Sequence, residues 1–170
     1  GTEICEEIEK QGYAGMIKER TGIQLSPYFS AAKLAWIFRN AEGVKERAKA
    51  GKIACGTIDS FLVYRLTGGK QVRTDYSNAS RTQLFNIRTL KWDKEILDIF
   101  GIGPSCMAQV TDSNGDYGET DLEGLLDRPI PIRGVLGDSH GALFGQGCLK
   151  EGMVKATYGT GSSIMMNTGE

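Results

Sequence analysis

Apolar residues near the start of the chain recur at the spacing of an amphipathic helix. Ile4 and Ile8 fall one turn apart within residues 3–10, and residues 13–20 continue the pattern after a break at Gly12. Helices of this kind turn one apolar stripe toward a core and leave the other side in water. We therefore expect a helix over residues 3–10 that residues 13–20 continue after the break.

Residues 26–40 predict a third helix whose start the sequence leaves open. Four apolar positions follow the i, i+3, i+4, i+7 spacing of one buried face: Ala31, Leu34, Ala35 and Phe38. Ser26 could cap this helix, with Pro27 in its first turn. Ser30 could cap it instead, which would leave residues 27–29 in a loop.

Three more helices are predicted before residue 102. Residues 44–50 form a short charged helix. The segment TIDSFLVYRLTGG forms another, which Gly68 ends; its apolar residues Ile58, Phe61, Leu62 and Leu66 fall on one face. In WDKEILDIFG we expect Asp93 to cap a compact helix and Gly101 to end it.

The remaining segments predict strands and turns. The predicted strands are residues 82–87, 132–137, 153–157 and 163–167. Two polar stretches, residues 75–80 and 111–131, are expected to be solvated turns and loops. The last two strands flank a Tyr158-Gly159-Thr160-Gly161 turn. Helices with interspersed strands indicate the α/β fold class.

Composition narrows the function classes. The 170 residues carry 20 Lys+Arg and 21 Asp+Glu, a net charge of −1, so there is no basic excess to attract nucleic acid. The four cysteines are far apart and the chain has one histidine, which excludes zinc-site spacing and favours reduced thiols in a cytoplasmic protein. No apolar run approaches the ~20 residues of a membrane span.

The tight turn Gly137-Asp138-Ser139-His140-Gly141 carries two candidate chemical groups. It spells G-x-S-x-G, the pattern that exposes a nucleophilic serine in hydrolases. That chemistry needs a histidine facing the serine, and His140 directly follows Ser139, so the two side chains point apart. Asp138 could instead accept a proton from a substrate hydroxyl, or it could only cap the next helix.

Two other segments have a functional and a plain interpretation. In TYGTGSS, backbone N–H groups and the Thr160 hydroxyl could approach phosphate oxygens, but an ordinary glycine-rich hairpin turn has the same pattern. Tyr28, between Pro27 and Phe29, is typical of a packing residue.

Five motifs, taken in order, resemble the FGGY-type carbohydrate kinases. They are PYFSAAKLAWI, GTIDSFLVYRLTGG, TDYSNASRTQLFNI, GDSHGALFGQ and TYGTGSSIMMNTG. The resemblance covers essentially the whole chain and is greatest to members that phosphorylate glycerol. It implies part of an actin-like, ribonuclease-H-like ATPase fold, a mixed sheet with helices. By this resemblance residues 1–148 are the latter part of the first, substrate-side domain, and residues 149–170 are the opening β-hairpin of the second, nucleotide-side domain.

The resemblance also implies the chemistry and its residues. The family transfers the γ-phosphoryl of Mg-ATP to a terminal hydroxyl of a polyol, so ATP, Mg²⁺ and a small polyol are expected, in a homo-oligomeric parent protein. By motif, Asp138 is the expected general base, touches the substrate, and could meet Mg²⁺ through water. Tyr28 and Ser139 match substrate contacts, and Thr160 and Gly161 match the loop that meets the nucleotide phosphates.

Two departures qualify this expectation. Members acting on glycerol usually read GDQQAALFGQ where this chain reads GDSHGALFGQ, so the short Ser139 replaces a glutamine. A kinase for another polyol or a ketose is therefore an alternative, and a serine hydrolase is a remote one. The family's D-x-G-T phosphate hairpin and its substrate-gripping Arg-Glu pair are absent from these 170 residues, so we expect the chain alone to be inactive.

Overall fold

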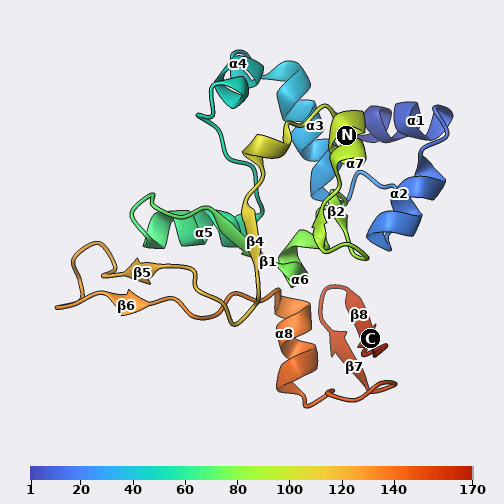
Figure 1. Cartoon of the computed structure of the whole chain (residues 1–170). Coiled ribbons are helices and arrows are strands. Elements are labelled where there is room, and N and C mark those ends of the chain that lie inside the picture. Colours follow the sequence, from blue (N-terminus) through green and yellow to red (C-terminus); the bar gives the residue numbers. More distant parts are fainter. Residues whose placement is uncertain (170) are drawn as a thin grey trace. The chain divides into compact units, whose positions relative to one another are not determined.

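The computed structural model describes residues 1–169, which divide into two compact units, residues 1–135 and the described residues from 136 onward (Figure 1). The helices of the first unit are α1 (Thr2–Lys10), α2 (Ala14–Thr21), α3 (Ser30–Asn40), α4 (Val44–Lys49), α5 (Ile58–Leu66), α6 (Tyr76–Ala79) and α7 (Lys94–Phe100), with a 3-10 turn η1 (Pro104–Cys106). Its strands are β1 (Arg73–Asp75), β2 (Phe85–Asn86), β3 (Lys91–Trp92), β4 (Gln109–Thr111), β5 (Glu119–Thr120) and β6 (Ile130–Pro131). The second unit contains α8 (Asp138–Gly145), β7 (Val154–Tyr158) and β8 (Ser162–Met166).

The apolar core of the first unit lies among α1, α2, α3 and α7 (Figure 1). Ile4 and Ile8 of α1 are buried in it, as their spacing predicts. Ala35 and Phe38 enter it from α3, and Leu97 enters it from α7. The helical faces predicted for residues 3–10 and 30–40 are therefore confirmed.

The structure settles where α3 begins. The helix starts at Ser30, and Pro27, Tyr28 and Phe29 precede it. Neither serine caps it through its side chain: the Ser26 hydroxyl accepts from the Tyr28 amide at 3.2 Å, and the Ala31 amide donates to the Thr82 carbonyl at 3.0 Å. A carbonyl distant in sequence thus replaces the expected local cap.

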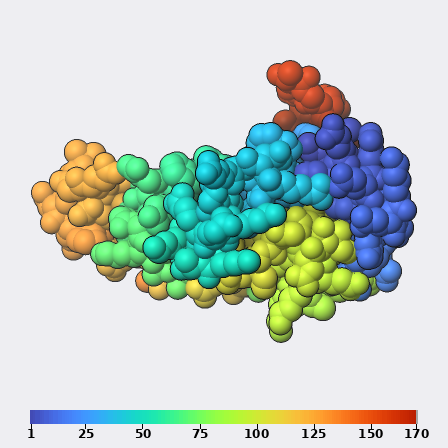
Figure 2. Space-filling model, turned by 90° about the horizontal axis from the view of Figure 1, so that it is seen from above, coloured from blue at the N-terminus to red at the C-terminus, as the bar shows by residue number. Residues whose placement is uncertain are grey.

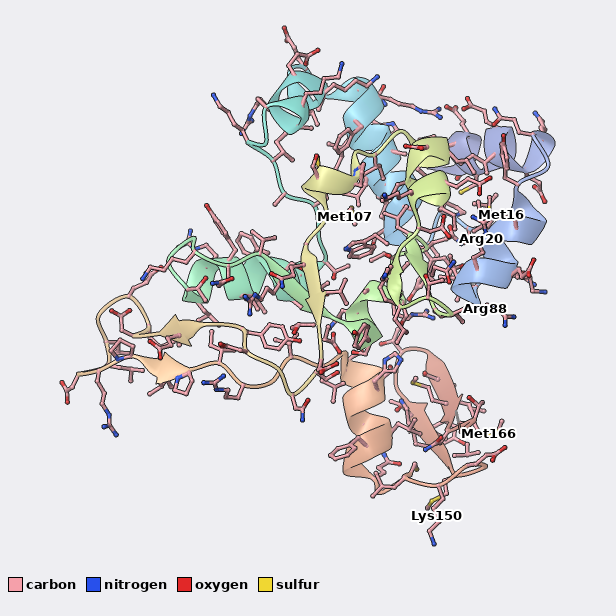
Figure 3. The ribbon with its side chains drawn as sticks, viewed as in Figure 1. Met16, Arg20, Arg88, Met107, Lys150 and Met166 are labelled. Atoms are coloured by element: carbon pink, nitrogen blue, oxygen red, sulfur yellow. The ribbon has the colours of Figure 1, made fainter. Side chains whose placement is uncertain are left out.

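Both predicted ends of α7 are confirmed. The Asp93 carboxylate accepts from the Ile96 amide at 3.2 Å, and Gly101 ends the helix with a left-handed φ of 70°. Arg20, which Figure 3 labels near the end of α2, donates to Asp93 at 3.3 Å and to Glu95 at 2.7 Å. These contacts join α2 to the start of α7.

The described strands form four two-stranded sheets, one parallel and three antiparallel, and together with the helices they confirm the expected α/β class. β1 and β4 run parallel, and Cys55 forms a parallel bridge to Met107 just before β4. The other pairs, β2–β3, β5–β6 and β7–β8, are antiparallel.

Two predicted strands are wrong. Within residues 82–87 only Phe85 and Asn86 are extended and paired, because Gln83 takes a left-handed φ of 67° and turns the chain. In the other segment β6 ends at Pro131; Ile132 still exchanges backbone hydrogen bonds with Tyr117 and Gly118, but residues 133–137 belong to no strand.

The expected loop at residues 111–131 is partly a ribbon. β5 and β6 pair antiparallel within it, and Arg65 of α5 pairs with Glu123 at 3.0 Å. Figure 2 shows this ribbon in orange beside the green α5 segment. Each strand of the ribbon is only two residues long, too short to show an alternating pattern among the surrounding turn-forming residues.

The apolar face of α5 is exposed. Its four apolar residues, Ile58, Phe61, Leu62 and Leu66, are 38–70% exposed. The opposite side, with Ser60 and Val63, is buried and lies toward β1. Helical periodicity identifies residues that share a face, but it does not say which face the fold covers.

Candidate functional site

Asp138 is the first residue of α8, and its carboxylate is exposed. Gly137 occupies the capping position and no side-chain cap bond is formed there, so the interpretation of Asp138 as a helix cap is wrong. Asp138 Oδ1 accepts from the Ser139 amide at 2.6 Å. The carboxylate is thus held against the helix start and remains accessible to a ligand.

Ser139 and His140 follow on the same helical turn and are partly buried. Consecutive residues of an α-helix project about 100° apart, so their side chains do not face each other. This geometry gives no support to a serine–histidine pair, and it leaves Ser139 beside Asp138 as a short hydroxyl side chain.

The glycine-rich turn joins β7 to β8 in the second unit. The strands pair from Val154↔Met166 to Tyr158↔Ser162, so the turn is Gly159-Thr160-Gly161, one residue shorter than expected. Thr160 and Gly161 are exposed, and a Cβ at Gly161 would meet nothing within 4 Å. The backbone of this turn is therefore open to a ligand.

Lys155 of β7 is a buried cation that the sequence reasoning missed. Its Nζ donates to the Thr157 hydroxyl at 2.7 Å, on the same side of the strand. The alternation of β7 offers a signal, since Lys155 and Thr157 share the face opposite Val154 and Ala156.

Tyr28 is 74% exposed, so its expected role as a packing residue is wrong. Its ring meets Phe29 edge to face at 5.3 Å, and Lys33 Nζ donates to the Tyr28 carbonyl at 2.8 Å. The backbone is held, while the phenol is accessible to a ligand. Tyr28 belongs to the first unit; Asp138, Ser139, Thr160 and Gly161 all belong to the second.

Asp75 is the most completely hydrogen-bonded carboxylate of the described chain, although a solvated turn was expected at residues 75–80. It is fully buried at the N-cap of α6. Burial alone would raise the pKa of Asp75, but hydrogen bonds from Ser77, Ser113 and Asn78 outweigh burial and hold that pKa below its ordinary value. The spacing Asp75-x-Ser77-Asn78 is a capping pattern that could have revealed it.

Within residues 1–169, no cluster of three or more His, Cys, Asp or Glu side chains could hold a metal ion. The four cysteines are free and buried, as expected. The first unit has a cavity of about 730 Å³ lined by residues 51–57, parts of α5 and residues 105–107. None of the predicted site residues lines this cavity.

Comparison with known proteins places the chain in a family. The model of the N-terminal domain of the FGGY family of carbohydrate kinases matches residues 1–145. The chain is 55% identical over 170 residues to glycerol kinase 1 of Thermotoga maritima and 51% identical over 168 residues to the glycerol kinase of Bacillus licheniformis. The chain therefore belongs to the FGGY family of carbohydrate kinases.

Solved structures agree with this assignment. A Plasmodium falciparum glycerol kinase with ADP matches 97% of the chain with a TM-score of 0.90 and 34% identity. A gluconate kinase from Lactobacillus acidophilus matches with a TM-score of 0.82 at 23% identity, which supports the fold alone. The actin-like fold expected from the motifs is thus confirmed.

The chain spans 34% of the length of these two curated glycerol kinases and 33% of the Plasmodium chain. In the part of the chain that the structure describes, no helix has both the length and the apolar character needed to cross a membrane.

Proposed function

We propose that this chain is the substrate-side part of an ATP-dependent kinase that phosphorylates glycerol. The observation that carries the proposal is the exposed Asp138 carboxylate at the start of α8, in the GD motif of a family whose similar members are named glycerol kinases. The exposed turn at Thr160 and Gly161 supports a role in contacting nucleotide phosphates. We also propose residues 1–148 and 149–170 as parts of the first and second domains.

Asp138 would act on the attacking hydroxyl. One carboxylate oxygen, Oδ1, is held by the Ser139 amide, so the exposed carboxylate can accept the hydroxyl proton as the hydroxyl oxygen bonds to the γ-phosphorus. The bond between the γ-phosphorus and the β,γ-bridging oxygen breaks in the same step, and ADP leaves. Tyr28 and Ser139 would orient the polyol through their hydroxyl groups. Thr160 and the open backbone at Gly161 would donate hydrogen bonds to phosphate oxygens.

Mg²⁺ fits this site only together with the nucleotide. Magnesium is commonly held by one or two carboxylates with substrate phosphates and water, and residues 1–169 offer no protein cage of three carboxylates or similar ligands. Asp138 would hold the ion through water, and the bound ion would neutralise charge on the phosphates. Homo-oligomer formation, a cytoplasmic location and the absence of a nucleic-acid partner belong to the same proposal.

A second candidate is a kinase for a longer polyol or a ketose. The observation in its favour is Ser139, which places a short side chain beside Asp138 where glutamine is usual for glycerol. A longer substrate could occupy the volume that glutamine leaves, and Ser139→Gln would then shift preference toward glycerol.

The test is a chimaera in which this chain replaces the matching third of Thermotoga maritima glycerol kinase 1, with the unaltered host as control. We expect it to transfer the labelled γ-phosphate of ATP to glycerol, and the 170-residue chain alone to transfer none. Transfer only to a longer polyol or ketose would favour the second candidate. A folded chimaera that phosphorylates no alcohol would contradict both.

A further inference from the structure

The carboxylate of Asp75 is fixed by five donors. Oδ1 accepts from the Asn78 amide at 3.0 Å and from Asn78 Nδ2 at 2.7 Å. Oδ2 accepts from the Ser77 amide at 3.1 Å, the Ser77 hydroxyl at 2.5 Å and the Ser113 hydroxyl at 2.7 Å. A buried carboxylate with this many donors has one orientation, because any rotation leaves donors unsatisfied.

Capping explains four of these bonds but not the fifth. Ser77 and Asn78 belong to α6, which Asp75 caps, so their donation is local. Ser113 lies 38 residues further along the chain and is part of no helix or strand. Its hydroxyl is therefore tied to Asp75 for a reason other than the start of α6.

Ser113 is also where the β5–β6 ribbon closes. The chain leaves β4 at Thr111, runs out and back along the ribbon, and returns at Val135. There the Val135 amide donates to the Ser113 carbonyl at 2.9 Å. Ser113 thus holds Asp75 through its hydroxyl and the returning chain through its carbonyl.

We propose that Asp75 and Ser113 are positioning residues for Asp138, because they fix the backbone at Val135, three residues before it. This inference rests on the proposed function, in which Asp138 is the general base. A catalytic group displaced by about 1 Å can lose about 100-fold in rate. Loosening Val135 removes one anchor of the segment that leads into α8 without changing any group that touches substrate.

The experiment uses the chimaera with Ser113→Ala, which removes the hydroxyl, and Ser113→Thr, which keeps it. We expect Ser113→Ala to lower kcat about 10- to 100-fold with KM for ATP within about twofold, and Ser113→Thr to restore most of kcat. Thr120→Ala is the matched control: this buried hydroxyl lies in the same ribbon and accepts from the Leu122 amide, away from Asp75. It should leave kcat within about twofold. Asp75→Asn should lower kcat as Ser113→Ala does. If the Asp75→Asn chimaera does not fold, the result for Ser113→Ala alone tests the inference.

A double-mutant cycle with Asp138→Asn separates positioning from general structure. If Ser113 acts through Asp138, Ser113→Ala should lower the residual rate of the Asp138→Asn chimaera by less than about twofold. A full additional loss in that background, or an unchanged kcat in the single variant, would overturn the inference and leave the proposed function standing. Full activity of the Asp138→Asn chimaera would overturn both.

Discussion

Asp93 connects three parts of the first unit, and removing its carboxylate should destabilise the chain strongly. It caps α7 through the Ile96 amide at 3.2 Å, accepts from Asn86 Nδ2 at 2.9 Å, and pairs with Arg20 at 3.3 Å. Its side chain is almost fully buried, whereas that of Arg20 is one-third exposed. The change Asp93→Ala removes all three contacts at once.

The size of the effect follows from these contacts. Loss of an N-cap costs about 0.5–2 kcal/mol, and a hydrogen bond to a charged group is worth about 1.5–3 kcal/mol. The solvent-screened pair with Arg20 adds little to this. Since the contacts share one carboxylate and are not additive, we expect Asp93→Ala to lower the free energy of unfolding by about 3 kcal/mol.

The loss should depend on pH in one direction. Burial alone would raise the pKa of Asp93, but the bonds from Asn86, Ile96 and Arg20 outweigh burial and hold that pKa below its ordinary value of 3.8. A carboxyl with a lowered pKa in the folded state stabilises the fold above its ordinary pKa, and this stabilisation disappears as pH falls through the folded value. The difference between wild type and Asp93→Ala should therefore be largest near neutral pH and shrink below about pH 4.

Urea unfolding of the 170-residue chain at several pH values measures this difference. Asp98→Ala is the control, because Asp98 is exposed near the other end of α7 and its removal should change stability by less than about 0.5 kcal/mol. A loss below about 1 kcal/mol for Asp93→Ala near pH 7, or the same loss above and below pH 4, would refute the reasoning.

Further predictions concern burial. Leu97 is 0% exposed and Leu125 is 78% exposed, so Leu97→Ala should cost about 3 kcal/mol in urea unfolding and Leu125→Ala close to nothing; equal costs would contradict the core assignment. Burial, with the neighbouring Cys106 thiol, raises the pKa of Cys55 to about 11 from 9.0. Near pH 8 the thiolate fraction of Cys55 is then about 100-fold lower than in the unfolded chain. The rate of Cys55 alkylation, measured by peptide mass spectrometry, should therefore be lower by at least about 100-fold in the folded chain. Equal rates in folded and unfolded chain would contradict it.

Sequence reasoning succeeded where a structure depends on neighbours in sequence. The ends of α7 at Asp93 and Gly101 are local capping events, and they were predicted. The faces of α1 and α3 were predicted because their spacing is regular and the core covers them. The pattern grouped the apolar residues of α5 on one face but did not say which face is buried, because burial depends on which elements pack against the helix.

In the candidate site, too, features that depend on neighbours in sequence were predicted and features that depend on distant residues were not. The local residue pattern placed Thr160 in a hairpin turn, and the structure has it there. The same kind of pattern placed Asp138 in a tight turn just before a helix, whereas Asp138 is the first residue of α8. Residue patterns predicted a solvated turn at Asp75, because its fifth donor, Ser113, lies far along the chain. A pattern read over a few residues gives no sign of a partner 38 residues away.

The most direct test of the central claim is ADP release by the chimaera, with and without glycerol, before and after Asp138→Asn. The account predicts glycerol-dependent release that Asp138→Asn lowers by at least about 100-fold, since general-base catalysis contributes about 10²–10⁴-fold. Glycerol-dependent release that persists at the same rate in the Asp138→Asn chimaera would contradict it.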